Sequence, residues 1–386
     1  MKIAFDATAL YGSFGGIENA LFQTFFHLCT LDHRNEYLIF VPRDAPLRLW
    51  KPPFSRNPRW EIRRLPFNGR EKARRIVWQQ FELPRLLQRE NCDLLHAWNY
   101  VAPLLAPIPT ILTAQDLIAL DAPRFATRFN RLHYRAVMPR ALKNAARVIV
   151  TTNQTKRDVL RRAPRAQVRV IPLGINEIFF EELARNRRME VAAKYDLPPR
   201  FLLYVGNFEP KKNLPNLLRA LKMVPDAPPL VIAGGIKPWP HYESILRGVR
   251  QLGFVDRTEL PALYGMCEAF CFPSLMEGFG LPVVEALACG APVLSSNRVP
   301  LPDLASVAEI CEPRFPRSIA RALEKLLSEE FAALPNDFSA ANPQKMKSSL
   351  FSGSNPQKMK QRRDYAAQFR WQETARRTLA VYREFL

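Results

Sequence analysis

The sequence predicts an α/β protein with two Rossmann-like, doubly wound domains. Two observations carry this prediction. Short apolar segments alternate with helical patterns through the first half of the chain, and a second series of the same kind begins near residue 200. The chain has 386 residues, of which 47% are hydrophobic, and this is enough to form two complete cores. Alternation of this type is typical of a mostly parallel sheet with helices on both faces.

The first domain is expected to span residues 1–178. Its strand candidates are "KIAFDA", "EYLIFV", "WEIRRL", "DLLHAW", "TILTAQD" and "RVIVTT". A long helical pattern, "RFATRFNRLHYRAVMPRALKNAA", places Phe125, Phe129, Leu132 and Ala136 on one face and arginines on another. The opening "MKIAFDATAL" fits a first strand and is too short for a signal peptide.

The second domain is expected to span residues 179–363. Its strand candidates are "FLLYVGN", "PLVIAGG", "GFV", "AFCFPS", "PVLSS" and "AEICEP". The polar, irregular stretch "VIPLGINEIFFEELARNRRMEVAAKYDLPPR" connects the two domains. An amphipathic helix over residues 364–386 ends the chain. Ligands of doubly wound folds bind outside the carboxyl ends of the strands, so two facing domains predict a binding cleft.

One segment departs from this alternation. "FSAANPQKMK" at residue 338 is followed by "FSGSNPQKMK" at residue 351, a near repeat with a period of 13. The repeat is too short to form a solenoid. We therefore expect a local duplication in a surface loop.

Composition limits the class of protein. Residues 97–115 carry no formal charge, but Pro103, Pro107 and Pro109 interrupt them, which favours strand, loop and strand over a membrane span. The six cysteines form no Cys-x-x-Cys pair, and we expect reduced thiols in a cytoplasmic protein.

The net charge of +20 is unevenly distributed. Residues 1–178 carry +14 and the rest carry +6, with dense basic stretches at 43–85 and 124–169. Such charge attracts an anionic surface, and an anionic membrane is the partner expected; basic residues that only solvate helix faces are the alternative. Nucleic acid is not expected, because no recognition helix or aromatic-basic RNA motif accompanies the charge.

The stretch "PSLMEGFGLPVVEALACG" at residues 273–290 combines two carboxylates with a glycine-rich turn. Glu277 and Glu285 lie eight residues apart, and Pro282 fits the first turn of a helix. Backbone amides at such a helix start can bind an anion, and a carboxylate can accept two hydrogen bonds from a vicinal diol. Compensation of the helix dipole by glutamate is the alternative.

This stretch, read with several others, resembles the group 1 family of retaining glycosyltransferases. "YVGNFEPKKNLPNLLRAL" resembles the family's phosphate-binding segment, "VIPLGIN" its hinge, and "GFVDRTELPALY" the segment that leads to the base pocket. "YGSFGGIENAL" resembles the first glycine-rich loop and "FRWQETARRTLAVY" the final helix. The resemblance implies the GT-B fold, in which two Rossmann-like domains face a cleft and the C-terminal helix crosses back to the first domain.

The resemblance also implies roles for individual residues. Glu277 would bind the donor sugar, Glu285 the ribose hydroxyls, and Lys212 the diphosphate. Further donor-binding residues would be Gly15, Gly16, Gly206, Asn207, Lys211, Gly278, Phe279, Gly280 and Leu281. An exposed loop lysine is the alternative for Lys212, and a plain turn between strand and helix is the alternative for the pair Gly15–Gly16.

Two residues depart from the family pattern. Gln115, implied to be catalytic, stands where many relatives carry histidine, and Asn207 stands where many carry arginine. On the acceptor side the resemblance suggests Asp116 and His96, although His96 could equally serve packing.

The reaction implied is transfer of a sugar, with mannose suggested by "EPKKN", from a nucleotide diphosphate sugar to a glycan or lipid-linked acceptor. No cofactor or metal is expected, since the acids in "DLIALD" are too widely spaced for an Asp-x-Asp site. The alternative is a catalytically weak nucleotide-sugar-binding protein. The expected location is the cytoplasm, peripheral at the inner face of the membrane.

Overall fold

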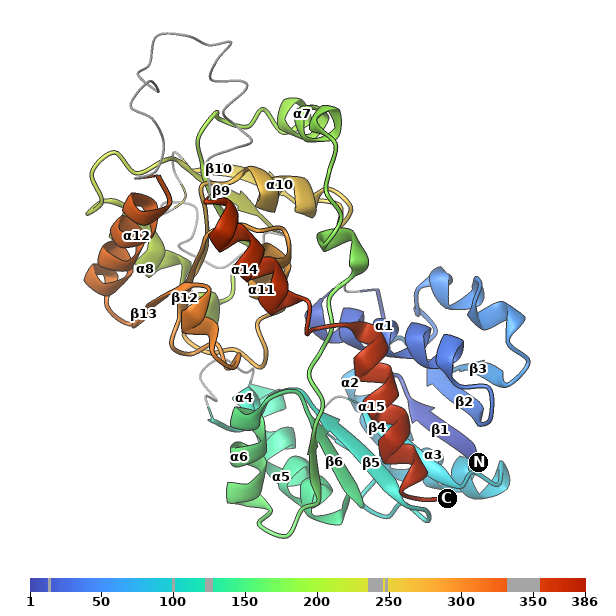
Figure 1. The fold of residues 1–386 in the computed structure, drawn as a ribbon. Coiled ribbons are helices and arrows are strands. Elements are labelled where there is room, and N and C mark those ends of the chain that lie inside the picture. The colour runs from blue at the N-terminus through green and yellow to red at the C-terminus, as the bar shows by residue number, and fades with distance from the viewer. Residues whose placement is uncertain (13–14, 99–100, 122–127, 235–245, 247–248, 332–354) are drawn as a thin grey trace. The chain divides into compact units, whose positions relative to one another are not determined.

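The computed structural model describes residues 1–12, 15–98, 101–121, 128–234, 246, 249–331 and 355–386 (Figure 1). The chain forms two compact units. Unit 1 comprises Met1–Gly174 and Phe369–Leu386, and unit 2 comprises Ile175–Gln368. The sequence places the corresponding boundaries after residues 178 and 363.

Unit 1 is built on a seven-stranded sheet in the order β3-β2-β1-β4-β5-β6-β7. Every neighbouring pair of strands is parallel. The strands are β1 (Lys2–Asp6), β2 (Glu36–Val41), β3 (Trp60–Arg64), β4 (Leu94–Trp98), β5 (Thr110–Ala114), β6 (Arg147–Val150) and β7 (Val168–Val170). The first six correspond to the predicted strands. No strand was predicted at β7, whose three residues complete the sheet beside β6.

Helices cover both faces of this sheet. Successive residues of a strand point to opposite faces, so Ala4 joins the core under the helical segment 72–89, while the ring of Phe5 meets that of Phe25 in α1. The helices are α1 (Gly16–Leu31), α2 (Lys72–Val77), the π-helical turn η3 (Trp78–Glu82), α3 (Leu83–Arg89), α4 (Ile118–Asp121), α5 (Arg128–Asn144), α6 (Asn153–Arg162) and α15 (Trp371–Arg383). The short 3-10 helices are η1 (Leu47–Trp50) and η2 (Phe54–Arg56).

The C-terminal helix belongs to unit 1. α15 packs beside α1 (Figure 1), and Thr374 Oγ1 donates to the carbonyl oxygen of Pro172 at 2.8 Å. At its end, Glu384 forms ion pairs with Arg147 and Arg169. The prediction that the terminal helix crosses back to the first domain is confirmed.

The apolar face predicted for α5 is wrong. Leu132 is 75% exposed and Ala136 is also exposed. The helix instead buries Met138, Ala141 and Leu142 against β5 and β6. Leu132 and Ala136 therefore do not lie on the face that packs on the sheet. The other two predicted members, Phe125 and the side chain of Phe129, lie outside the described residues.

Unit 2 contains a six-stranded parallel sheet in the order β10-β9-β8-β11-β12-β13. Its strands are β8 (Leu202–Val205), β9 (Leu230–Ala233), β10 (Arg250–Gly253), β11 (Ala269–Phe272), β12 (Val293–Ser296) and β13 (Glu309–Cys311). Its helices are η5 (Glu177–Phe179), α7 (Arg185–Lys194), η6 (Pro210–Lys212), α8 (Leu214–Leu221), α10 (Leu260–Met266), α11 (Leu281–Ala288), η7 (Leu304–Ser306), α12 (Pro316–Phe331) and α14 (Pro356–Ala366).

The strand predicted at "GFV" is displaced. β10 covers Arg250–Gly253 and ends where the prediction begins. Gly253 has a positive φ of +68°, which turns the chain out of the strand and leaves Phe254 70% exposed.

The surface-loop prediction for the repeat is wrong for its second copy, Asn355–Lys360. This copy opens α14, and the Asn355 side chain accepts hydrogen bonds from the amides of Gln357 and Lys358. Asparagine before proline is a helix start signal, because the amide oxygen caps the first turn and proline needs no donor there. Met359 packs so closely on Gly290 that a Cβ at Gly290 would lie 2.4 Å from its Cγ. The first copy, at 342–347, lies outside the described residues.

Candidate functional site

In each sheet the strand order reverses at one place. In unit 1 this switch point lies between β1 and β4, and in unit 2 it lies between β8 and β11. Open parallel sheets bind ligands beyond the carboxyl ends of the strands at such a point, because the loops diverge there. In unit 2 the loops that follow β8 and β11 contain Lys212 and Glu277, so the strand order brings the two predicted residues to one edge.

Hydrogen bonds hold the two loops of the unit 2 switch point together. Leu275 N donates to the Lys211 carbonyl oxygen at 2.7 Å. Asn213, which is 4% exposed and has a φ of +63°, donates from Nδ2 to the carbonyl oxygens of Pro273 and Pro313 at 2.9 and 2.6 Å. Asparagine tolerates this left-handed conformation better than most residues. Sequence reasoning missed Asn213, although an asparagine directly before a helix start was a usable signal.

Lys212 and Glu277 form an ion pair across these loops. Lys212 Nζ lies 2.7 Å from Glu277 Oε1 and 4.6 Å from the centroid of the Phe272 ring. The two side chains are 15% and 9% exposed. The alternative of an exposed loop lysine is therefore wrong. The cation and the carboxylate neutralise each other at the switch point.

Glu285 is paired with a cation that the sequence did not single out. Arg257 Nη2 lies 2.5 Å from Glu285 Oε1, and Tyr264 OH lies 3.5 Å from Oε2. The Glu285 side chain is only 6% exposed. Burial raises the pKa of Glu285, and the charge of Arg257 opposes that rise. Arg257 lies in "GFVDRTELPALY", 28 residues before Glu285, and that spacing does not predict the contact.

Gly280 makes the turn between the two glutamates. It has a φ of +105°, and a Cβ there would lie 2.7 Å from Val299 Cγ1, so only glycine fits. Phe279 is buried, and α11 begins at Leu281 with Pro282 in its first turn, as predicted. Gly278 precedes them in the same loop.

The start of the lysine loop is also shaped by glycine. Gly206 has a φ of +151°, and its carbonyl oxygen lies 2.0 Å from where a Cβ at Gly234 would be. The ends of β8 and β9 thus approach closely. Asn207 follows, and its carbonyl oxygen accepts from Glu209 N at 2.8 Å. Lys211 pairs with Glu209 at 3.5 Å.

In unit 1 the loop after β1 leads into α1. Gly15 caps the helix and Gly16 is its first residue, with no atom within 4 Å of a Cβ added there. Glu18, 1% exposed, accepts a hydrogen bond from Gly12 N at 3.0 Å and lies 4.0 Å from Arg48 Nη2. Glu18 holds this glycine loop, a role that sequence reasoning missed.

Gln115 directly follows β5 and carries an unpaired donor. The residue is 8% exposed, and its Nε2 has no hydrogen-bond partner within the described ranges. Its main-chain oxygen accepts from Thr151 Oγ1 at 3.0 Å. A buried donor without a partner is costly, so it calls for an explanation such as a ligand atom that it could bond. Next to it, Asp116 Oδ1 accepts from Ile118 N at 3.0 Å, a local contact at the start of α4.

The acceptor assignment of His96 is wrong. His96 lies within β4 and is 0% exposed. Its Nδ1 lies 2.7 Å from Tyr382 OH and its Nε2 lies 2.7 Å from Thr113 Oγ1. Burial lowers the pKa of His96 to about 3, so the ring is neutral. A neutral, enclosed imidazole with both nitrogens bonded belongs to the core, which is the packing alternative.

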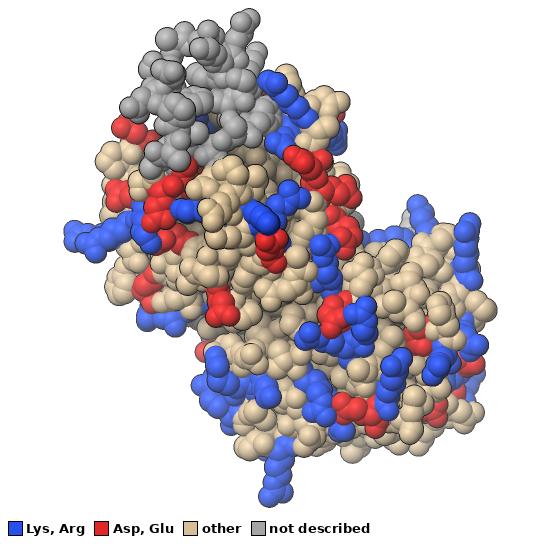
Figure 2. Space-filling model, in the orientation of Figure 1, with Lys and Arg blue, Asp and Glu red and all other residues tan. Residues whose placement is uncertain are grey.

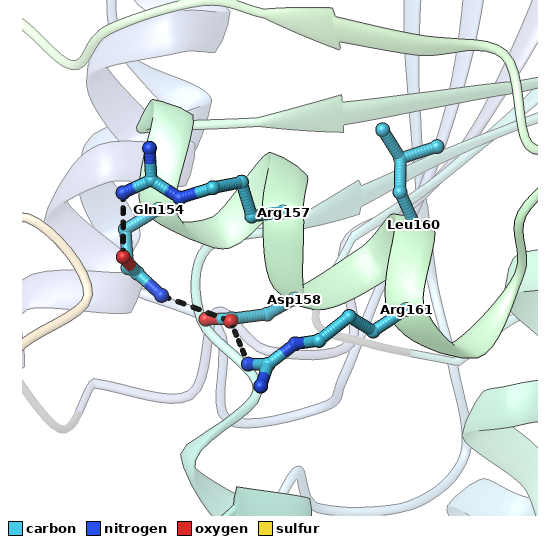
Figure 3. Close-up of a pocket in the computed structure, with 5 residues that line it drawn as sticks. All are labelled: Gln154, Arg157, Asp158, Leu160 and Arg161. Carbon is cyan, nitrogen blue, oxygen red and sulfur yellow. Dashed lines mark hydrogen bonds and ion pairs between the residues drawn. The ribbon is translucent and has the colours of Figure 1, made fainter.

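A surface pocket on α6 involves none of these residues (Figure 3). Its polar lining residues bond one another: Gln154 Nε2 to Asp158 Oδ1 at 2.9 Å, and Arg157 to Gln154 Oε1 at 2.7 Å. All the lining residues lie on one helix, so the pocket lacks groups that converge from separate loops.

The described ranges contain neither a metal-binding cluster nor a membrane-spanning helix. No group of three or more His, Cys, Asp or Glu there could hold a metal ion. None of the helices that the structure describes is long and apolar enough to cross a membrane.

Comparison with known protein families gives two matches. Residues 188–345 match the family described as glycosyl transferases group 1, and residues 14–178 match the one described as glycosyltransferase family 4. A serotype-specific mannosyltransferase of Escherichia coli, WbdA, is 30% identical over 259 residues. That alignment covers 61% of this chain and 31% of the relative, so the chain spans about a third of that protein's length.

Solved structures share the fold over the whole chain. Sucrose-phosphate synthase from Thermosynechococcus elongatus has a TM-score of 0.74 at 21% identity, covering 100% of this chain and 98% of that one. HepE of Anabaena, solved with UDP-glucose, has a TM-score of 0.68 at 16% identity and covers 100% of both chains. These likenesses confirm the predicted GT-B fold of two parallel-sheet domains.

Proposed function

The chain belongs to the group 1 family of glycosyltransferases, and we propose that it transfers a sugar from a nucleotide diphosphate sugar to a glycan or lipid-linked acceptor, with retention at the anomeric carbon. The observation that carries this proposal is the arrangement at the switch point of unit 2. Two carboxylates eight residues apart each contact a cation from another loop. The carboxylates suit hydroxyl groups, and Lys212 suits a phosphate.

In this proposal, binding of the donor separates the Lys212–Glu277 ion pair. Lys212 leaves Glu277 for the diphosphate, and Glu277 becomes free to accept hydrogen bonds from the sugar. The leaving diphosphate gains negative charge, which Lys212, with help from Lys211, would stabilise. The acceptor would attack from the face that the diphosphate leaves, and the leaving phosphate would take the acceptor's proton. No step requires a protein nucleophile or a metal.

Gln115 would serve the donor from unit 1. Its buried Nε2 has no partner among the described residues, so a phosphate or sugar oxygen would satisfy it. It cannot carry charge, unlike a histidine at the same place. The amides that begin α1, at Gly15 and Gly16, would also face the phosphate.

Mannose is the sugar we propose, and the nucleotide base is left to experiment. WbdA is named a mannosyltransferase, and HepE binds UDP-glucose in its solved structure. Thermal unfolding with UDP, GDP and their sugars tests the donor, because a ligand at 100 times its Kd stabilises a protein by about 2.7 kcal/mol. Transfer with the best donor, followed by NMR of the product anomer, tests retention. If no nucleotide sugar raises the unfolding temperature, the proposal fails.

A catalytically weak nucleotide-sugar-binding protein is the second candidate. The neutral side chains of Gln115 and Asn207 favour it, because both stand where many relatives carry a basic residue. The two candidates separate in one assay. Stabilisation by a nucleotide sugar without release of nucleoside diphosphate, in the presence of a panel of lipid-linked and glycan acceptors, would support the binding protein.

We propose, in addition, cytoplasmic location with peripheral binding of unit 1 to anionic membrane. Basic side chains are prominent over α5 and α6 (Figure 2), and Arg70 and Arg74 are exposed beside the exposed apolar residues Val77 and Phe81. Each basic residue near an anionic bilayer adds about 1 kcal/mol of attraction, which salt screens. Vesicle co-sedimentation at low and high salt tests this. Charge reversal at Arg70 and Arg74 should reduce binding, whereas reversal of Arg314 in unit 2 should not; equal binding to neutral vesicles would contradict the proposal.

A further inference from the structure

We propose that Arg257 is a positioning residue for nucleotide binding: it holds the Glu285 carboxylate in the orientation that accepts the two hydroxyls of a ribose. Arg257 thereby sets the preference for ribonucleotides over deoxyribonucleotides. The inference rests on the proposed function, in which Glu285 binds the ribose of the donor.

The contacts of Glu285 come from two directions. Arg257 lies between the end of β10 and the start of α10, and its Nη2 reaches Oε1 at 2.5 Å. Tyr264, within α10, places its hydroxyl 3.5 Å from Oε2. Phe179 backs both residues: its ring centroid lies 5.3 Å from Arg257 Cζ and 6.1 Å from the Tyr264 ring. The carboxylate is therefore oriented by residues outside its own helix.

A count of acceptor sites shows what this arrangement leaves for a ligand. An ionised carboxylate offers about four lone-pair sites, two on each oxygen. Arg257 occupies one site on Oε1, whereas the Tyr264 hydroxyl, 3.5 Å from Oε2, is at most a weak donor. Each oxygen therefore keeps at least one acceptor site, and two adjacent acceptors match the two hydroxyls of a vicinal diol. A carboxylate that could rotate freely would not keep both sites directed toward the same diol.

Charge supports the same role. The Glu285 side chain is 6% exposed, and burial alone would favour the protonated carboxyl, which has fewer acceptor sites. The Arg257 side chain is 35% exposed and opposes this effect through its charge. Its Nε is buried without a hydrogen-bond partner in the described part of the chain. The guanidinium of Arg257 therefore keeps Nη2 on Glu285 although its Nε has no hydrogen-bond partner among the described residues.

The test compares ribonucleotides with their 2′-deoxy analogues. Calorimetry would give the Kd of UDP, dUDP, GDP and dGDP for the wild type, Arg257→Gln, Arg257→Lys and Glu285→Gln. Arg250→Gln is the matched control, because Arg250 is also partly exposed in unit 2 and pairs with Asp196 at 3.3 Å, away from Glu285. Unfolding temperatures would show that every variant is folded.

We expect the wild type to prefer the ribonucleotide by about tenfold or more, as for a hydrogen bond to a charged group. Glu285→Gln and Arg257→Gln should both reduce that preference to a few-fold, and Arg250→Gln should retain it. Arg257→Lys should fall between, because lysine supplies charge without the planar guanidinium.

The outcomes separate the two proposals. If Glu285→Gln abolishes the preference and Arg257→Gln keeps it or binds ribonucleotides more tightly, the role of Arg257 is wrong and the proposed function stands. If Glu285→Gln keeps the wild-type preference, Glu285 does not bind ribose, and both the placement of the donor and this inference fail. An absence of nucleotide binding by the wild type overturns both as well.

Discussion

The two switch points use their polar residues differently. In unit 2, Lys212 contacts Glu277 across the loops that follow β8 and β11, and Arg257, which follows β10, contacts Glu285 in α11. In unit 1, Glu18 bonds the amide of Gly12 six residues away, and Asp116 bonds the amide of Ile118 two residues away. The first arrangement places opposite charges within hydrogen-bond distance, whereas in the second these two carboxylates bond amides of their own loops and Glu18 lies 4.0 Å from Arg48. We therefore expect the chemistry to depend far more on unit 2.

Loss of the Glu277 carboxylate tests this difference most strongly. Glu277→Ala should lower the rate of sugar transfer by about 10²–10³, because a preorganised polar group at the sugar is removed. Glu268→Ala, which breaks a surface pair with Arg200 in the same unit, is the control. A steady-state transfer assay decides it: if the Glu277 variant keeps more than half of the wild-type rate, the carboxylate does not serve the donor sugar.

A Lys212 variant tests whether the cation of the Lys212–Glu277 pair contacts the phosphates of the donor. Lys212→Ala should weaken nucleoside diphosphate binding by roughly 10- to 100-fold, since hydrogen bonds to charged groups contribute about 1.5–3 kcal/mol. Binding of the uncharged nucleoside should change little. Calorimetry with both ligands measures the contrast, with Arg219→Ala on the exposed part of α8 as control. Equal weakening of both ligands would show that Lys212 does not contact the phosphates.

A Gln115 variant tests how far sugar transfer also depends on unit 1. Gln115→Ala should slow transfer by about fivefold, the effect of one neutral hydrogen bond of about 1 kcal/mol. The same change removes a buried donor that has no partner among the described residues, so the unfolding temperature should stay the same or rise. Transfer rates and thermal unfolding are measured on one preparation. A slower enzyme that is also much less stable would indicate a packing role.

The smallest expected effect concerns Glu285 and pH. Burial raises the pKa of Glu285, so the folded protein holds this proton more tightly than the unfolded chain does. The stabilising contribution is present below the ordinary glutamate pKa of about 4.3 and is lost as pH rises through the folded pKa.

Glu285→Gln should therefore be more stable than the wild type at pH 7, and this gain should shrink as pH falls toward 4. A gain of 1 kcal/mol corresponds to about 2–4 °C in a domain of roughly 150–250 residues, and unit 2 falls within that range. Thermal unfolding across that pH range measures it. A variant that is less stable at pH 7 would mean that attraction to Arg257 outweighs the cost of burial.

Local patterns in the sequence determined much of this protein. Alternating apolar segments predicted parallel sheets, and the residues that follow each strand were predicted to gather at one edge, because parallel strands share a direction. The turn around Gly280 and the helix start at Pro282 needed only local reasoning, since each depends on its immediate neighbours in the chain. The roles of Lys212, Glu277 and Glu285 were implied by the family resemblance.

Tertiary structure decided which partners these residues have. Asn213 bonds carbonyl groups 60 and 100 residues away, Arg257 reaches Glu285 across 28 residues, and His96 lies against Tyr382 across 286. Strand order and helix packing set such contacts, and a single sequence carries no periodicity that reports them. For the same reason, the sequence suggested His96 as a ligand contact and Leu132 as a core residue. In the structure, His96 is buried against Tyr382 of α15, and Leu132 of α5 is exposed.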